Sequence, residues 1–130
     1  MVKRILVVDD EPDMVVIMKL TLENNGFEVI TAYDGQEGMD KAREEKPDLI
    51  ILDVLMPKVF GNEIVTLLKK DPGLSGIPII MLTNVPLAFL SGEQKRENEF
   101  EKDSKGNILL TKSCSEEELL AAIEQASQKL

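Results

Sequence analysis

The chain has 130 residues, a length typical of one domain with its own hydrophobic core, and we expect residues 1–130 to form a single domain. It carries 24 acidic and 15 basic residues, a formal net charge of −9, so repulsion disfavours duplex nucleic acid and anionic membranes as direct partners. The chain has no histidine, which excludes histidine general bases, histidine metal ligands and phosphohistidine on this chain. Aromatic residues make up only 4%, so the core must be built from aliphatic side chains and methionine.

The cysteine content and the N-terminal sequence indicate a soluble, cytoplasmic protein. Cys114 is the only cysteine, so no internal disulfide can form, which suits a reducing compartment. The first apolar run covers only residues 5–8, which is too short for a signal peptide. No later run is long enough to cross a membrane.

Short apolar runs alternate with amphipathic segments along the chain. The strands are expected at residues 5–8, 27–32, 48–53, 78–83 and 107–111. The helices are expected at residues 12–24, 36–46, 61–70 and 116–128. Ser115 and Glu118 form a capping box for the last of these helices. A further helix is expected between residues 85 and 106, where we interpret the charged run 93–105 as a solvated helix face.

Alternation of this kind, with no internal repeat and no linker, predicts an α/β fold. Five β–α units joined by right-handed crossovers give a parallel sheet with helices on both faces. In such open sheets, ligands bind at the edge where the strands end at their carboxyl termini.

Polar side chains follow four of the five predicted strands at that edge. Asp9 and Asp10 follow the first strand, Asp53 ends the third, Thr83 ends the fourth and Lys112 follows the fifth. Each feature alone has an ordinary explanation as a turn, a helix cap or a solvated charge. Their joint placement at strand ends instead predicts a common crevice that contains three carboxylates, one hydroxyl and one ammonium group.

Three crowded carboxylates repel one another unless a cation is present. Without histidine or paired cysteines, the expected ion is one that prefers oxygen ligands, and Mg²⁺ also keeps waters that a phosphate can replace. The remaining groups then suit a phosphoryl site. Asp53 is the candidate nucleophile, because carboxylates form aspartyl phosphates, while Lys112 and Thr83 can bind the phosphoryl oxygens.

These residues resemble the receiver domains of two-component response regulators, and in particular the chemotaxis regulators. The segment ILVVDDEPD at 5–13 resembles the first strand and acidic pair of the family, and residues 32–61 resemble its central segment. That segment carries the pattern Asp-x-x-Met-Pro-x-x-x-Gly, which begins at Asp53, and the Leu-Thr and Thr-Lys pairs that end at Thr83 and Lys112 complete the set. The resemblance implies a flavodoxin-like, doubly wound, five-stranded parallel sheet of order 2-1-3-4-5 with five helices.

The resemblance also implies roles for individual residues. Asp53 would be the phosphoacceptor and a ligand of Mg²⁺, and Asp10 would bind the ion directly. Asp9 would act mainly through a metal-bound water, and the backbone carbonyl of Leu55 would be a further ligand.

By the same resemblance, Thr83 and Lys112 would contact the phosphoryl oxygens as catalytic residues. The donor would be the phosphohistidine of a sensor histidine kinase or of a phosphotransfer protein, and a downstream protein effector would read the result. The domain would catalyse its own phosphorylation and its own dephosphorylation rather than turn over an external substrate.

Several positions depart from the family pattern. Ser113 stands where the family has a proline preceded by a cis peptide bond, which bears on the direction of Lys112. Leu109 replaces an aromatic residue that takes part in switching, and Asn84 replaces a small residue near the phosphate entrance. The segment 83–112 is also longer than usual, so the output face is expected to be atypical.

These departures leave alternatives to an active phosphoacceptor. One is a pseudo-receiver, which keeps the fold as a protein-interaction module without phosphorylation. A phosphatase or phosphotransferase with an aspartate nucleophile is disfavoured, because its acid–base residue would stand at the position of Leu55. A flavin-binding protein is disfavoured because the loop after the first strand is acidic where a phosphate needs donors.

Two apolar side chains predict a long-lived phosphoryl group. In the family, the side chains two residues after the phosphoacceptor and two residues after the threonine can orient or block the hydrolytic water. Here they are Leu55 and Val85, and neither side chain can hydrogen-bond to a water molecule. We therefore expect slow autodephosphorylation, to be measured as the half-life of phospho-Asp53 at neutral pH with Mg²⁺. A half-life of seconds would rule this expectation out.

Overall fold

The structure is a computed structural model that describes residues 2–53, 61–83, 101–102 and 107–128, with the backbone alone described at 61–65, 83 and 101–102. Its strands are β1 (Arg4–Val8), β2 (Glu28–Ala32), β3 (Leu49–Asp53), β4 (Ile79–Thr83), β5 (Glu101–Lys102) and β6 (Ile108–Thr111). Its helices are α1 (Pro12–Asn24), α2 (Gly35–Glu45), α3 (Gly61–Lys70) and α4 (Glu116–Ser127). None of the helices described has both the length and the apolar character needed to span a bilayer.

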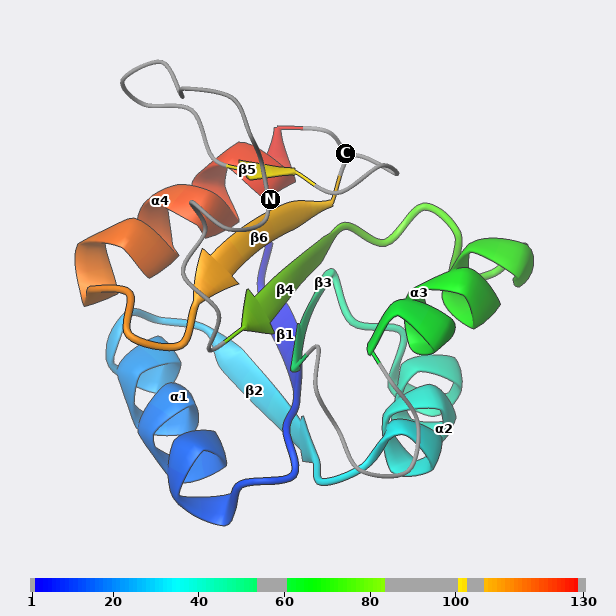
Figure 1. The fold of residues 1–130 in the computed structure, drawn as a ribbon, viewed down its shortest axis with the longest axis horizontal. Helices are drawn as coiled ribbons and strands as arrows, with labels where there is room; N and C mark the ends of the chain where they lie inside the picture. Colours follow the sequence, from blue (N-terminus) through cyan, green and yellow to red (C-terminus); the bar gives the residue numbers. More distant parts are fainter. Residues whose placement is uncertain (1, 54–60, 84–100, 103–106, 129–130) are drawn as a thin grey trace.

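One sheet runs through the centre of the molecule, in the order β2-β1-β3-β4-β6-β5. The first five of these strands are parallel neighbours, as Figure 1 shows. The predicted five-stranded parallel sheet of order 2-1-3-4-5 is therefore confirmed, with β6 as its fifth strand. Helices α1 and α4 cover one face of this sheet, and α2 and α3 cover the other (Figure 1).

The segment between β4 and β6 contains an element that the sequence did not predict. β5 pairs antiparallel with β6 at the edge of the sheet, with Glu101 opposite Leu109 and Lys102 opposite Ile108. These two charged residues fall within the run that we interpreted as a helix face, and for them the interpretation was wrong. Without β5, strand β6 would lie at the edge of the sheet with unpaired backbone N–H and C=O groups, which a neighbouring segment can pair with. The charge pattern of the run does not distinguish such an edge strand from a solvated helix. The rest of the expected fourth helix lies outside the described residues, so four of the five expected helices are described.

The core has two layers, which follow the alternation of side chains along each strand. Towards α1 and α4 the sheet directs Ile5, Val7, Leu49, Ile51, Ile80 and Leu82. Towards α2 and α3 it directs Leu6, Val8, Ile50, Leu52, Ile79 and Met81. All buried hydrophobic residues in the described part are aliphatic or methionine, as the low aromatic content predicted.

Helix starts and close helix–sheet contacts position the carboxyl edge of the sheet. The Asp34 side chain caps α2 by accepting a hydrogen bond from the Glu37 amide at 2.8 Å, and Ser115 forms the predicted capping box with Glu118 at the start of α4. At Gly38 a β-carbon would lie 3.0 Å from both methyl groups of Val8. Glycine therefore allows α2 to pack closely on the end of β1.

The strand register brings the predicted site residues to the same edge. Val8 pairs with Leu52. Asp9, the first residue after β1, and Asp53, the last residue of β3, therefore lie at the same level of the sheet. On the other side of β3, strands β4 and β6 end together, because Thr83 pairs with Thr111. Lys112 is the residue that follows Thr111. The carboxyl ends therefore meet as the alternating sequence predicted.

At the opposite edge, the Asp48 carboxylate ties β1 to the start of β3. Its Oδ2 atom accepts hydrogen bonds from the backbone amides of Lys3 and Arg4, both at 3.0 Å. The amides of Arg4 and then Lys3 lower the pKa of Asp48 below its ordinary value, because they stabilise the charged form.

Replacement of Asp48 by alanine should destabilise the protein by about 2 kcal/mol at pH 7, since two backbone donors lose a charged acceptor. Because the pKa of Asp48 is lower in the folded state, the stabilisation that its carboxylate provides is fully present above the ordinary aspartate pKa of about 4. This stabilisation is lost as the pH falls through the folded-state pKa. The difference between wild type and variant in urea denaturation should therefore shrink on acidification. The exposed Asp13→Ala control should differ from wild type by less than about 0.5 kcal/mol, and a difference for Asp48→Ala that grew on acidification would contradict the account.

Candidate functional site

Two buried carboxylates lie at the carboxyl edge of the sheet, where the sequence predicted them. The side chain of Asp9 is 1% exposed and that of Asp53 is 2% exposed, although both are charged groups. Buried carboxylates of this kind are rare unless they are paired or bind a cation. Asp10 is partly exposed beside them, so the structure brings together the three aspartates of the predicted cluster.

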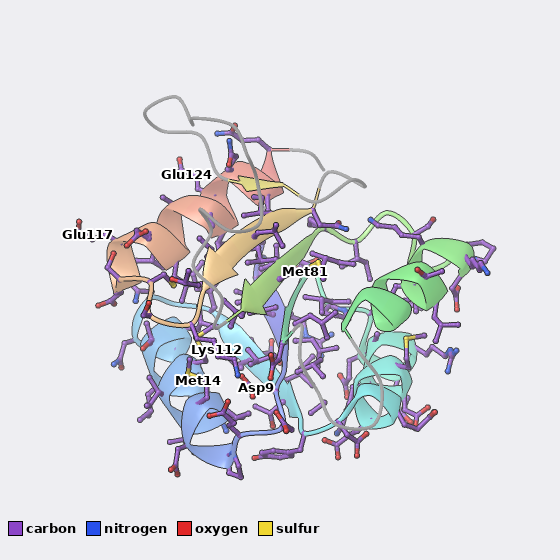
Figure 2. The ribbon with its side chains drawn as sticks, viewed as in Figure 1. Asp9, Met14, Met81, Lys112, Glu117 and Glu124 are labelled. Carbon is purple, nitrogen blue, oxygen red and sulfur yellow. The ribbon has the colours of Figure 1, made fainter. Side chains whose placement is uncertain are left out.

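The predicted lysine enters the same cluster from the end of β6. The Nζ atom of Lys112 lies 3.0 Å from Asp53 Oδ2 and 3.3 Å from Asp9 Oδ2, and its side chain is only 9% exposed. Figure 2 shows Lys112 and Asp9 side by side at this edge. Burial alone would lower the pKa of Lys112, but hydrogen bonds with Glu11 and Asp53 outweigh it and raise that pKa above the ordinary value. Lys112 is therefore a fixed positive charge beside the candidate nucleophile.

The direction of Lys112 does not require the proline that usually follows it in the family. No cis peptide bond occurs among the described residues, so the Lys112–Ser113 bond is trans. The Thr111 Oγ1 and Ser113 Oγ atoms lie 3.2 Å apart as hydrogen-bond partners. Lys112 contacts both buried aspartates although the peptide bond that follows it is trans. A proline at position 113 is therefore not needed to direct the Lys112 side chain into the site.

The pKa of Asp10 is raised by burial and by its neighbour Asp53. Burial, followed by a hydrogen bond with Asp53 and by the charge of that residue, raises the pKa of Asp10 above its ordinary value. The charge of Lys112 opposes this shift but does not cancel it. Burial and the charge of Asp53 therefore both disfavour the ionised form of Asp10.

The residues present fit a hard divalent cation. Carboxylate oxygens of Asp9, Asp10, Glu11 and Asp53 lie within 4.8 Å of one another. The Oδ2 atom of Asp9 is buried and accepts no hydrogen bond, although it lies within ion-pair distance of Lys112. An all-oxygen donor set with an unsatisfied buried oxygen suits Mg²⁺ better than a metal that prefers nitrogen or sulfur ligands.

Glu11 belongs to the cluster, although the sequence did not identify it as a site residue. Its Oε1 atom lies 2.8 Å from Lys112 Nζ. Its backbone amide donates to Asp9 Oδ1 at 2.9 Å. The available signal was its position directly after the acidic pair, but the lysine that it contacts is 101 residues away in the chain.

The other predicted positions are placed less fully. Thr83 ends β4 beside Thr111 of β6, as predicted, and only its backbone is described. Leu55, Asn84 and Val85 lie outside the described residues. Leu109 packs, partly buried, against the hydrophobic layer on the α2 and α3 side of the sheet, where the family has its switching aromatic residue.

Comparisons with known proteins agree with this geometry. The family model described as "Response regulator receiver domain" matches residues 5–124. The chain is 35% identical over 120 residues to Protein PilH of Pseudomonas aeruginosa, and the match covers 92% of this chain and 93% of PilH. It is 49% identical over 81 residues to the alkaline phosphatase synthesis transcriptional regulatory protein PhoP of Bacillus subtilis, which covers 62% of this chain but only 33% of PhoP.

Solved structures agree as well. The chemotaxis response regulator CheY4 of Vibrio cholerae superimposes with a TM-score of 0.81 at 30% identity, over 97% of this chain and 99% of that one. The signal receiver domain of a histidine kinase from Syntrophus aciditrophicus superimposes with a TM-score of 0.79 at 27% identity, over 98% and 92% of the two chains. From the family match, the fold and the acidic edge of the sheet together, the chain belongs to the response regulator receiver domains of two-component signalling.

Proposed function

We propose that the chain accepts a phosphoryl group on Asp53 from a phosphohistidine donor in a Mg²⁺-dependent reaction. The observation that carries the proposal is the contact between Lys112 Nζ and Asp53 Oδ2 at 3.0 Å, inside a cluster of carboxylates. A buried carboxylate beside a fixed ammonium group suits a nucleophile whose product carries additional negative charge.

In the proposed reaction, a carboxylate oxygen of Asp53 attacks the phosphorus atom of the donor. The bond between phosphorus and the imidazole nitrogen breaks as the new phosphorus–oxygen bond forms, and the imidazole leaves with the electron pair. Lys112 binds a phosphoryl oxygen and neutralises part of its charge. The hydroxyl group of Thr83, a residue that ends β4 at the same edge, would donate a hydrogen bond to another phosphoryl oxygen.

Asp9, Asp10 and Asp53, together with the backbone carbonyl of Leu55, would hold the metal ion. The ion would neutralise charge on the carboxylates and on the phosphoryl oxygens when bound. The excess of acidic side chains over Lys112 and the unsatisfied Oδ2 atom of Asp9 support this assignment. Phosphorylation and later hydrolysis would then be reactions of the domain on itself, not turnover of an external substrate.

The proposed donor is a sensor histidine kinase or a phosphotransfer protein, and the proposed recipient of the signal is a separate protein effector. Relatives with related segments include Hybrid signal transduction histidine kinase D of Dictyostelium discoideum, 43% identical over 79 residues. Other relatives are named DNA-binding regulators, such as RpaA of Synechocystis. This chain spans about a third of PhoP, about half of RpaA and nearly all of PilH. Direct DNA binding is not proposed for it, because its net charge is −9.

The direct test is incubation with acetyl phosphate with and without Mg²⁺, followed by intact mass measurement. Wild type should gain one phosphate only with Mg²⁺, and Asp53→Asn should gain none because the amide is not a nucleophile. Asp13→Asn, which removes an exposed carboxylate outside the cluster, should behave as wild type.

A wild-type protein that stays unmodified with both acetyl phosphate and a phosphohistidine donor would contradict the proposal. That result would favour the pseudo-receiver alternative, in which the same fold serves as a constitutive protein-interaction module. A phosphate that remains on the Asp53→Asn variant would place the acceptor elsewhere.

A further inference from the structure

The contacts of Lys112 imply that one of its partners must leave when the site is phosphorylated. An ammonium group has three N–H donors. In the unphosphorylated protein Lys112 Nζ lies near three carboxylates, at 2.8 Å from Glu11, 3.0 Å from Asp53 and 3.3 Å from Asp9. A phosphoryl oxygen on Asp53 therefore gains an N–H from Lys112 only if a present acceptor gives one up.

Asp53 stays a partner of Lys112, because its phosphoryl group carries more negative charge and more acceptor oxygens than the carboxylate that it replaces. The partner that leaves is therefore Asp9 or Glu11, and their exposure indicates which one. The Glu11 side chain is 58% exposed, whereas those of Asp9 and Asp53 are 1% and 2% exposed. A released Glu11 carboxylate is hydrated by bulk water, so breaking its ion pair with Lys112 costs little free energy. Release of Asp9 would leave a buried carboxylate with less compensation, which is strongly unfavourable.

The backbone of Glu11 places its side chain for this exchange. Glu11 is the N-cap residue of α1, but its side chain makes no capping hydrogen bond and reaches Lys112 instead. Its amide is fixed to Asp9 Oδ1 and its carbonyl accepts from the Val15 amide at 3.1 Å. The side chain can therefore move while the backbone stays attached to the site and to the first turn of α1.

We propose that Glu11 is a positioning residue that holds the ammonium group of Lys112 in the unphosphorylated state and is displaced by the phosphoryl group on Asp53. The inference rests on the proposed function, because it concerns the same transfer to Asp53. Glu11 thus slows phosphorylation because it competes with the incoming phosphoryl oxygen for the ammonium group of Lys112. In the phosphorylated state, the Glu11 side chain at the start of α1 is released from Lys112.

Two substitutions distinguish the effect of the ion pair between Glu11 and Lys112 from the effect of the Glu11 charge alone. Glu11→Gln removes the charge and the pair. Glu11→Asp keeps the charge but shortens the side chain by one methylene, and aspartate at an N-cap position bonds readily to the amides of its own helix. Both variants should accept phosphate from acetyl phosphate about threefold to fivefold faster than wild type, the size expected for one ion pair whose carboxylate is exposed. The matched charge control Asp13→Asn should change the rate by less than about twofold.

The displacement itself can be observed on the Lys112 ammonium group by NMR. In the unmodified protein, the ¹⁵Nζ signal of Lys112 should differ between wild type and Glu11→Gln, and Asp13→Asn should leave it unchanged. In protein kept phosphorylated by excess acetyl phosphate and Mg²⁺, the signals of wild type and Glu11→Gln should coincide, because Glu11 has already left.

The outcomes are distinct. If Glu11→Gln phosphorylates at the wild-type rate, or if Glu11→Asp stays as slow as wild type, competition by the ion pair is wrong. If the difference in the Lys112 signal persists after phosphorylation, Glu11 is not displaced and the inference fails while the proposed function stands. A wild-type protein that gains no phosphate overturns both.

Discussion

The structure depends on the compensation of negative charge at one edge of a parallel sheet. Asp9 and Asp53 are almost fully buried, and Asp10 and Glu11 stand beside them. Within the described part of the chain, Lys112 is the cation that contacts this cluster, and it bonds to both buried aspartates. One ammonium group does not balance four carboxylates, and burial together with the neighbouring Asp53 raises the pKa of Asp10. This imbalance is the physical reason for expecting a divalent cation and an anionic substrate at the same place.

The fold supports this arrangement through features far from the chemistry. The register of β1 and β3 makes Asp9 and Asp53 emerge at one level, and the Asp48 carboxylate ties the opposite ends of those strands together. Close packing of α2 on Val8 requires a glycine at position 38. A side chain there would displace the helix or the strand end, and a shift of the strand end would move Asp9. The site is therefore built on the ends of strands, since Asp53 is the last residue of β3 and Asp9 is the first residue after β1.

Much of the fold and part of the site followed from local sequence patterns. Alternating apolar runs predicted the parallel sheet, and the polar residues at four of the five strand ends predicted that Asp53 and Lys112 would meet. Two features did not follow. The strand β5 lies in a charged run, and pairing with an exposed edge depends on where β6 ends in space rather than on the composition of the run. The contact between Glu11 and Lys112 joins residues 101 positions apart, so neither residue signals it locally.

We propose that repulsion between its carboxylates destabilises the cluster and that a divalent cation offsets this repulsion. The most direct test is the melting temperature of wild type, Asp10→Asn and Asp13→Asn at neutral pH as Mg²⁺ is raised from zero to millimolar concentrations. Without Mg²⁺, Asp10→Asn should melt above wild type, because it removes the carboxylate with the raised pKa. Added Mg²⁺ should raise the melting temperature of wild type and Asp13→Asn, since the ion binds only the folded state, and should raise that of Asp10→Asn much less. A wild-type melting temperature that does not change at millimolar Mg²⁺, or an Asp10→Asn variant less stable than wild type without the ion, would contradict the account.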